Sequence, residues 1–85
     1  MNTIREQLSR LIARDLGVAE DRVVDTASLE ADLAATSTDL VELVMSVEDE
    51  FHIDISDNEA SHLETVGDLV AFVEKKVRAE QERPA

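Results

Sequence analysis

The feature that most constrains this chain is a helix-start pattern, of which four instances precede candidate helices. In each, a Ser or Thr is followed three residues later by Asp or Glu. Two such side chains can satisfy free backbone amides in the first turn of a helix. The four patterns are Thr3-x-x-Glu6, Thr36-x-x-Asp39, Ser56-x-x-Glu59 and Thr65-x-x-Asp68. Four helix starts within 85 residues predict a small all-α protein.

Apolar residues at helical spacing follow three of these starts, predicting longer helices over 3–16, 37–51 and from 65 onward. Gly17 stands where a helix cap is expected, and the start at Ser56 predicts a short helix through His62 or Leu63. The three apolar stripes are Ile4, Leu8, Leu11, Ile12 and Leu16; Leu40, Val41, Val44, Val47 and Phe51, flanked by Leu43 and Met45; and Val66, Leu69, Val70, Val73 and Val77. The predicted fold is a small four-helix bundle, with three longer helices and one short helix.

The connections complete a single domain over residues 3–79, with a fraying tail at 80–85. Residues 18–36 show no sustained period and predict a long loop between the first and second helices. We expect its apolar residues to lie under the helices, with a short helical turn at 28–33. Residues 52–56 alternate like a strand, but one short strand has no partner, so we expect an extended connection.

The charge of the chain excludes several functions. It has 20 acidic and 8 basic residues, giving a net charge of −12, and residues 23–74 contain 14 acids but no Lys or Arg. Nucleic-acid binders need basic residues to displace counterions from phosphates, and anionic membrane surfaces attract basic segments. We therefore expect no nucleic-acid or membrane partner. An acidic surface keeps a protein monomeric and soluble, and it can steer basic partner proteins.

Enzymatic constellations are scarce in this sequence. The chain has no cysteine, so any thiol chemistry must use an imported thiol. His52 and His62 lack zinc-site spacing. The segment from Asp54 to Thr65 fails as a calcium loop because Glu59 stands where Gly is needed and Thr65 where Glu is needed. We expect a non-enzymatic protein with no metal site, and a cytoplasmic one because no apolar run suits a signal or a membrane span.

A serine, Ser37, begins the acidic second helix, and around it the sequence resembles a known family. The resemblance is to the free-standing (type II) acyl carrier proteins, and it extends over residues 4–77. The matching segments are Asp-Leu-Gly-Val at 15–18, Ala-Ser-Leu-Glu-Ala-Asp-Leu at 27–33, Val-Glu-Leu-Val-Met-Ser-Val-Glu-Asp-Glu-Phe at 41–51, Ile-Ser-Asp-Asn-Glu-Ala at 55–60 and Thr-Val-Gly-Asp-Leu at 65–69.

The resemblance implies a carrier of acyl groups for fatty-acid, polyketide or related synthesis. In the family, the serine that matches Ser37 is esterified with 4′-phosphopantetheine from coenzyme A, whose thiol holds acyl groups as thioesters. This group would supply the thiol that the chain lacks. The implied partners are a phosphopantetheinyl transferase and acyl-transferring and chain-elongating enzymes with basic docking patches. Ser28 also precedes a leucine, but it aligns with the loop before the attachment site.

The attachment motif departs from the family pattern. The family has Asp-Ser-Leu, whereas this chain has Thr36-Ser37-Thr38. The changes remove a carboxylate that helps the transferase to engage and an apolar contact for partner enzymes. Ser37 could also be an ordinary helix-cap residue. Two alternatives therefore stay open: a carrier-fold binding or adaptor module with no prosthetic group, and an aminoacyl or peptidyl carrier.

The resemblance also assigns candidate roles on and near the second helix. Glu42 and Glu48 are the first choices for docking, and any one lining residue could simply be core packing. The docking candidates are Asp39, Glu42, Glu48, Asp49 and Glu50. The residues expected to line an acyl chain are Leu40, Val44, Met45, Val47, Ile55, Ala60, Leu63 and Leu69.

Overall fold

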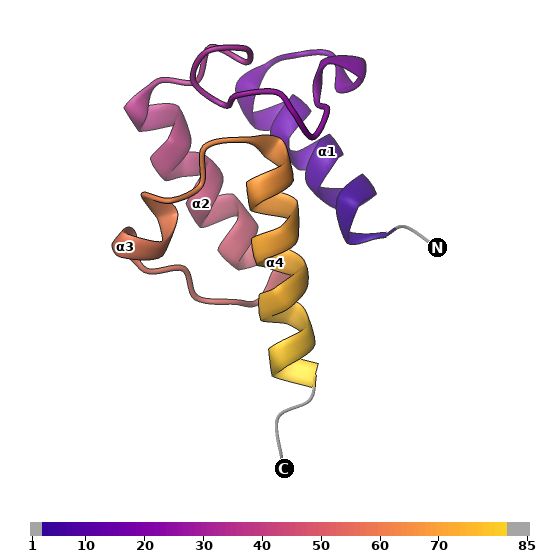
Figure 1. Ribbon diagram of the computed structural model, residues 1–85, viewed down its shortest axis with the longest axis vertical. Coiled ribbons are helices and arrows are strands. Elements are labelled where there is room, and N and C mark those ends of the chain that lie inside the picture. The colour runs from indigo at the N-terminus through magenta and orange to yellow at the C-terminus, as the bar shows by residue number, and fades with distance from the viewer. Residues whose placement is uncertain (1–2, 82–85) are drawn as a thin grey trace.

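The computed structural model describes residues 3–81 and, for side chains, residues 3–79. In this range the protein is all-helical and has the predicted four-helix architecture (Figure 1). The elements are α1 (Ile4–Leu16), the 3₁₀ helix η1 (Glu20–Arg22), α2 (Ser37–Phe51), α3 (Asp57–Ala60) and α4 (Val66–Gln81). In Figure 1 the long connection between α1 and α2 crosses one end of the bundle, near the start of α4.

All four predicted helix starts are present. The Ser or Thr side chain accepts the amide of the residue three positions later, at 3.1 Å in each case. At α2, α3 and α4 the acidic side chain also accepts the amide of the Ser or Thr, at 3.0 to 3.2 Å. Since these bonds satisfy amides that a helix leaves free, they fix where each helix begins.

The helix ends are set by backbone conformation. Gly17 ends α1 in the left-handed region, with φ of 67°, as its position predicts. His52 ends α2 in the same way, with φ of 55°. Helix α3 is shorter than predicted, because it ends at Ala60 and continues as hydrogen-bonded turns to Leu63. Helix α4 continues through Gln81, and the rest of the predicted tail lies outside the described residues.

The core is aliphatic, and the residues that α2 contributes to it differ from the predicted apolar face. Leu43 and Val47 are its two buried residues, whereas Val41, predicted to face inward, is 60% exposed. The apolar residues of α2 span an arc too wide for one packed face, so spacing alone does not identify the buried part. The predicted inward residues of α4 agree with the structure: Val66, Leu69, Val70 and Val73 are buried, and Val77 is partly buried.

The long connection is held by hydrogen bonds to the start of α4. The amides of Val66 and Gly67 donate to the carbonyls of Ala27 and Asp25, at 3.0 and 2.9 Å. A Cβ added at Gly67 would lie 3.0 Å from the Asp25 carbonyl oxygen, so glycine permits this close approach. The loop therefore has a fixed path, although it contains little regular structure.

The details of this loop differ from the prediction. Residues 28–33 form hydrogen-bonded turns rather than a helix. The short helix of this loop is η1, which was not predicted from the sequence. Val23, Leu29 and Leu33 are buried as expected, but Val24 is 50% exposed.

Few of the acids between residues 23 and 74 are neutralised. Among the described residues, only Asp25 and Glu59 of the fourteen form ion pairs, with Arg5 and Lys76. The other ion pairs, Arg10–Glu20 and Arg14–Asp15, lie earlier in the chain. The folded protein therefore concentrates like charges that the unfolded chain separates.

Screening this repulsion should stabilise the fold. Raising NaCl from about 10 mM to 150 mM shortens the screening length from about 30 Å to about 8 Å. We expect about 1 kcal/mol of stabilisation, which raises Tm by roughly 4–8 °C. Circular dichroism melts near neutral pH, with magnesium chloride at matched ionic strength, measure the effect. A Tm that does not change across the titration would show that self-repulsion does not limit stability.

Candidate functional site

The N-terminus of α2 presents Ser37 to solvent with its hydroxyl free. Thr36 is the N-cap: its hydroxyl accepts the Asp39 amide, while the Asp39 carboxylate accepts the Thr36 amide. Ser37 is the first residue of the helix and is exposed. Within residues 3–81, its hydroxyl and the amides of Ser37 and Thr38 have no hydrogen-bond partner. Because Thr36 provides the cap, the Ser37 oxygen remains available for chemistry.

The segment that precedes Ser37 is anchored. Leu33 and Ala35 are 3% and 7% exposed, and the Ala35 amide donates to the Leu29 carbonyl at 2.9 Å. Ala34, between them, adopts the left-handed region with φ of 57°. This turn brings the chain from the core to the surface within three residues. The backbone therefore holds Ser37 at a fixed place although it follows a long loop.

Ser28 has a different environment. Its hydroxyl accepts the Ala31 amide at 3.1 Å, and its own amide donates to the Asp32 carboxylate at 2.7 Å. Ser28 is only partly exposed, and it forms an isolated β-bridge with Thr65. Its side chain is used to shape the loop, in contrast to the free hydroxyl of Ser37.

An apolar cavity of about 420 Å³ lies beside α2, bounded by α3, the 61–63 turn and the start of α4. The first residue of α2 that lines it is Leu40, three residues after Ser37. All eight residues expected to line an acyl chain border this one cavity: Leu40, Val44, Met45, Val47, Ile55, Ala60, Leu63 and Leu69. Six further residues line the cavity without having been predicted to do so: Leu29, Val41, Leu43, Glu48, Asp57 and Ser61.

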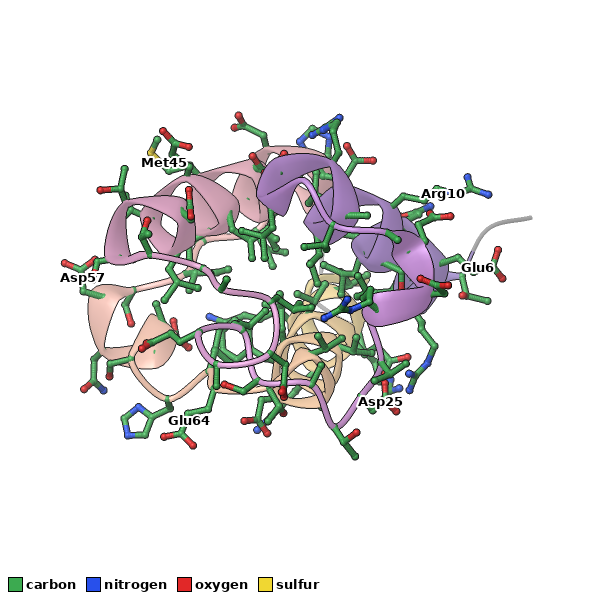
Figure 2. The ribbon with its side chains drawn as sticks, turned by 90° about the horizontal axis from the view of Figure 1, so that it is seen from above. Glu6, Arg10, Asp25, Met45, Asp57 and Glu64 are labelled. Atoms are coloured by element: carbon green, nitrogen blue, oxygen red, sulfur yellow. The ribbon has the colours of Figure 1, made fainter. Side chains whose placement is uncertain are left out.

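Figure 2 shows which side of the molecule this is. Met45 of α2 and Asp57 at the start of α3 lie on one side, and Glu6, Arg10 and Asp25 lie on the other. Arg10 and Arg14 instead border a small polar notch between α1 and α2, together with Glu50. The apolar cavity is thus separate from the basic residues of α1.

The five docking candidates do not share one surface. Glu42 and Asp49 are exposed, and their spacing of seven residues places them on one face of α2, with Met45 between them. Glu50 borders the notch against α1. Asp39 and Glu48 are partly buried and already accept backbone hydrogen bonds. Glu50 is exposed as well, so Glu42 and Asp49 are the exposed candidates that lie away from α1.

Glu48 stabilises the cavity wall. Its Oε2 accepts the Ile55 amide at 2.8 Å in a partly buried hydrogen bond, which ties α2 to the connection before α3. Removing the acceptor leaves this amide unsatisfied. We expect Glu48→Ala to lower the free energy of unfolding by about 1–3 kcal/mol, as measured by urea denaturation. Glu42→Ala is the matched control and should change it by less than about 0.5 kcal/mol; equal losses would exclude this role for Glu48.

Neither histidine contributes to the site. His52 is the exposed cap of α2, and Nδ1 of His62 lies 2.8 Å from the Asn58 carbonyl oxygen. Among the side chains of residues 3–79, no three His, Asp or Glu are grouped to hold a metal ion. In the same part of the chain, no helix has the length and apolar character that crossing a bilayer requires.

Comparison with known proteins identifies this arrangement. A family model described as a phosphopantetheine attachment site matches residues 6–73. A solved structure of an acyl carrier protein from Enterococcus faecalis is similar with a TM-score of 0.74 and 32% sequence identity, over 86% of this chain and 92% of that chain. The chain belongs to the acyl carrier protein family.

Acyl carrier proteins bear 4′-phosphopantetheine as a covalent prosthetic group, so this protein is a phosphopantetheine carrier. The family comprises carriers rather than catalysts, and its members work with a phosphopantetheinyl transferase and with enzymes of synthesis. The residues of this chain fit the group. The exposed Ser37 has a free hydroxyl, and Leu40, about one helical turn further along α2, lines the apolar cavity.

Proposed function

We propose that this protein tethers acyl intermediates as thioesters on a 4′-phosphopantetheine arm at Ser37, for fatty-acid, polyketide or related synthesis. The observation that carries the proposal is the free hydroxyl of Ser37 at the exposed start of α2, beside the apolar cavity. When attached, the arm supplies the thiol that this cysteine-free chain lacks.

The start of α2 suits an attached phosphate. In the loading reaction, Ser37 Oγ forms the new phosphodiester bond and the pyrophosphate bond of coenzyme A breaks. Adenosine bisphosphate leaves, and the proton of the Ser37 hydroxyl passes to a base. The product carries a negative charge next to the free amides of Ser37 and Thr38. The positive end of the helix dipole stabilises an anion at this position.

The cavity supports an aliphatic cargo. Leu40, Val44 and Leu63 are among the aliphatic side chains of its wall, and the polar lining residues Glu48, Asp57 and Ser61 are in the minority. An apolar acyl chain gains free energy when it leaves water for such a site. A charged aminoacyl or peptidyl group gains nothing comparable, so the cavity favours an acyl carrier over that alternative.

The exposed face of α2 supports docking on basic partner enzymes. Glu42 and Asp49 flank Met45, which is 54% exposed. Exposed charges act mainly on encounter rates and on salt dependence, which suits a carrier that must leave each enzyme after transfer. Asp39, Glu48 and Glu50 would contribute less directly, since the first two hold backbone amides and the third borders α1.

Reversing these two charges should slow loading. We expect Glu42→Lys with Asp49→Lys to lower the second-order rate of phosphopantetheinylation about tenfold at low salt, with the difference shrinking as salt is added. Glu64→Lys with Glu74→Lys, two exposed charge reversals outside α2, is the control for net charge. A rate equal to that of the control at low salt would remove Glu42 and Asp49 from the docking surface.

The proposed attachment site is tested by intact mass after incubation with coenzyme A and a broad-specificity phosphopantetheinyl transferase. The wild-type chain and Ser28→Ala should each gain one phosphopantetheine, and Ser37→Ala should gain none. A gain on Ser37→Ala would place the arm elsewhere. No gain on any chain would favour the adaptor alternative, which is consistent with Thr36 and Thr38 beside the serine.

A further inference from the structure

Helix α3 forms part of the cavity wall although it has little packing of its own. Asp57 and Ala60 of this four-residue helix line the cavity, yet none of its residues is buried. A single helical turn is not stable in isolation. Segments with few buried contacts open locally at a free energy far below that of global unfolding. The closure of this wall therefore depends on the few contacts that tie α3 to its neighbours.

The side chain of Glu59 makes two of these contacts. Glu59 Oε1 accepts the Ser56 amide at 3.0 Å, and Glu59 Oε2 lies 3.0 Å from Nζ of Lys76 on α4. The Glu59 carboxylate thus caps α3 and joins it to the long helix across the turn. The Ser56 amide and the ammonium of Lys76 hold the pKa of Glu59 below its usual range.

Lys76 is well placed to act as the fixed end of this ion pair. It follows the buried Val73 by one turn of α4, and its Nζ lies 5.5 Å from the centre of the Phe72 ring. The Glu59 and Lys76 side chains are 35% and 33% exposed, so their attraction is partly shielded from water. The adjacent Lys75 is exposed and forms no ion pair within the described residues.

We propose that the Glu59–Lys76 ion pair is a latch that holds α3 closed over the apolar cavity and so sets the rate at which an acyl chain enters and leaves it. The acyl chain as occupant rests on the proposed function; the latch itself rests on the contacts of α3. Breaking a partly exposed ion pair shifts an opening equilibrium about two- to fivefold. A change of that size alters cavity access without unfolding the bundle.

Amide hydrogen exchange of the unmodified chain tests the latch. Lys76→Met removes the charge and keeps the apolar stem, while Glu59→Gln removes the charge and keeps the helix-capping acceptor. Each should speed exchange of the Ala60 and Ser61 amides, which donate to Ser56 and Asp57 carbonyls, about two- to fivefold. Exchange at Leu43 and Val47 in α2 should not change. The double variant should exceed neither single variant, as expected when both changes remove one interaction.

Lys75→Met is the matched control, and it should leave exchange at Ala60 and Ser61 unchanged. Equal acceleration by Lys75→Met, or no acceleration by Lys76→Met, would overturn the latch. The association rate of the neutral apolar dye N-phenyl-1-naphthylamine reports cavity access, and it should rise in parallel with exchange. Faster exchange without faster dye entry would show that the ion pair fixes α3 without controlling the cavity. Neither measurement uses the arm, so failure of modification at Ser37 leaves both results decisive.

Discussion

Thr36→Asp together with Thr38→Leu should raise kcat/KM for phosphopantetheinylation about tenfold or more. The two substitutions match the attachment motif of the acyl carrier proteins that this chain resembles, returning a carboxylate and an apolar contact next to Ser37. A hydrogen bond to a charged group contributes about 1.5–3 kcal/mol, which corresponds to a factor of about 10–100. The fold should tolerate both changes, because Asp is as good a helix cap as Thr and Thr38 is exposed.

The effect is measured as the initial rate of phosphopantetheine transfer, monitored by intact mass at a limiting concentration of transferase. Thr36→Asn is the matched control, because Asn caps a helix without adding charge. We expect Thr36→Asn to modify at the wild-type rate and Thr36→Asp alone to modify faster, which would assign that part of the gain to the carboxylate. If the double variant reacts no faster than wild type, the two threonines are not what distinguishes this chain as a substrate.

Leu43→Ala should cost about 2–5 kcal/mol of the free energy of unfolding. Leu43 is 2% exposed, and it is both a core residue of α2 and part of the cavity wall. Truncation removes its buried apolar surface and leaves a void beside an existing cavity. A domain of this size is stabilised by only about 5–10 kcal/mol, so the loss is a large share of the total.

Urea denaturation with linear extrapolation gives the difference. Met45→Ala is the matched control on the same helix, since Met45 also borders the cavity but is 54% exposed. Its expected cost is below about 1 kcal/mol. A loss at Leu43 no greater than that at Met45 would mean that Val41 and Met45, rather than Leu43, face the core.

The helix starts could be predicted from sequence because their causes are local. Each cap joins side chains and amides only three residues apart, so Thr36 and Asp39 fix the start of α2 whatever surrounds them. The wrong prediction that Val41 faces the core, where the structure has Leu43, has a different cause. The apolar arc of α2 is wide, and only the packing of the other helices decides which part of it is buried.

The path of the loop and the polar contacts could not be predicted from the sequence, because they too depend on the packing of the whole fold. The carbonyls of Asp25 and Ala27 meet the start of α4 about forty residues later, and no local signal marks that pairing. Nothing in the sequence around Glu48 indicates that it accepts a backbone hydrogen bond rather than standing exposed as a free charge. The resemblance supplied the position of Ser37, but only the structure shows that Thr36 leaves its hydroxyl free.

The most direct test is the mass of this protein isolated from its own host, followed by cleavage at glutamates. Residues 23–74 contain no Lys or Arg, so trypsin leaves Ser28 and Ser37 in one peptide, whereas cleavage after Glu30 and Glu42 separates them. We expect a gain of one phosphopantetheine, with or without an acyl group, on the peptide spanning residues 31–42. An unmodified protein, or an arm on the peptide that contains Ser28, would contradict it.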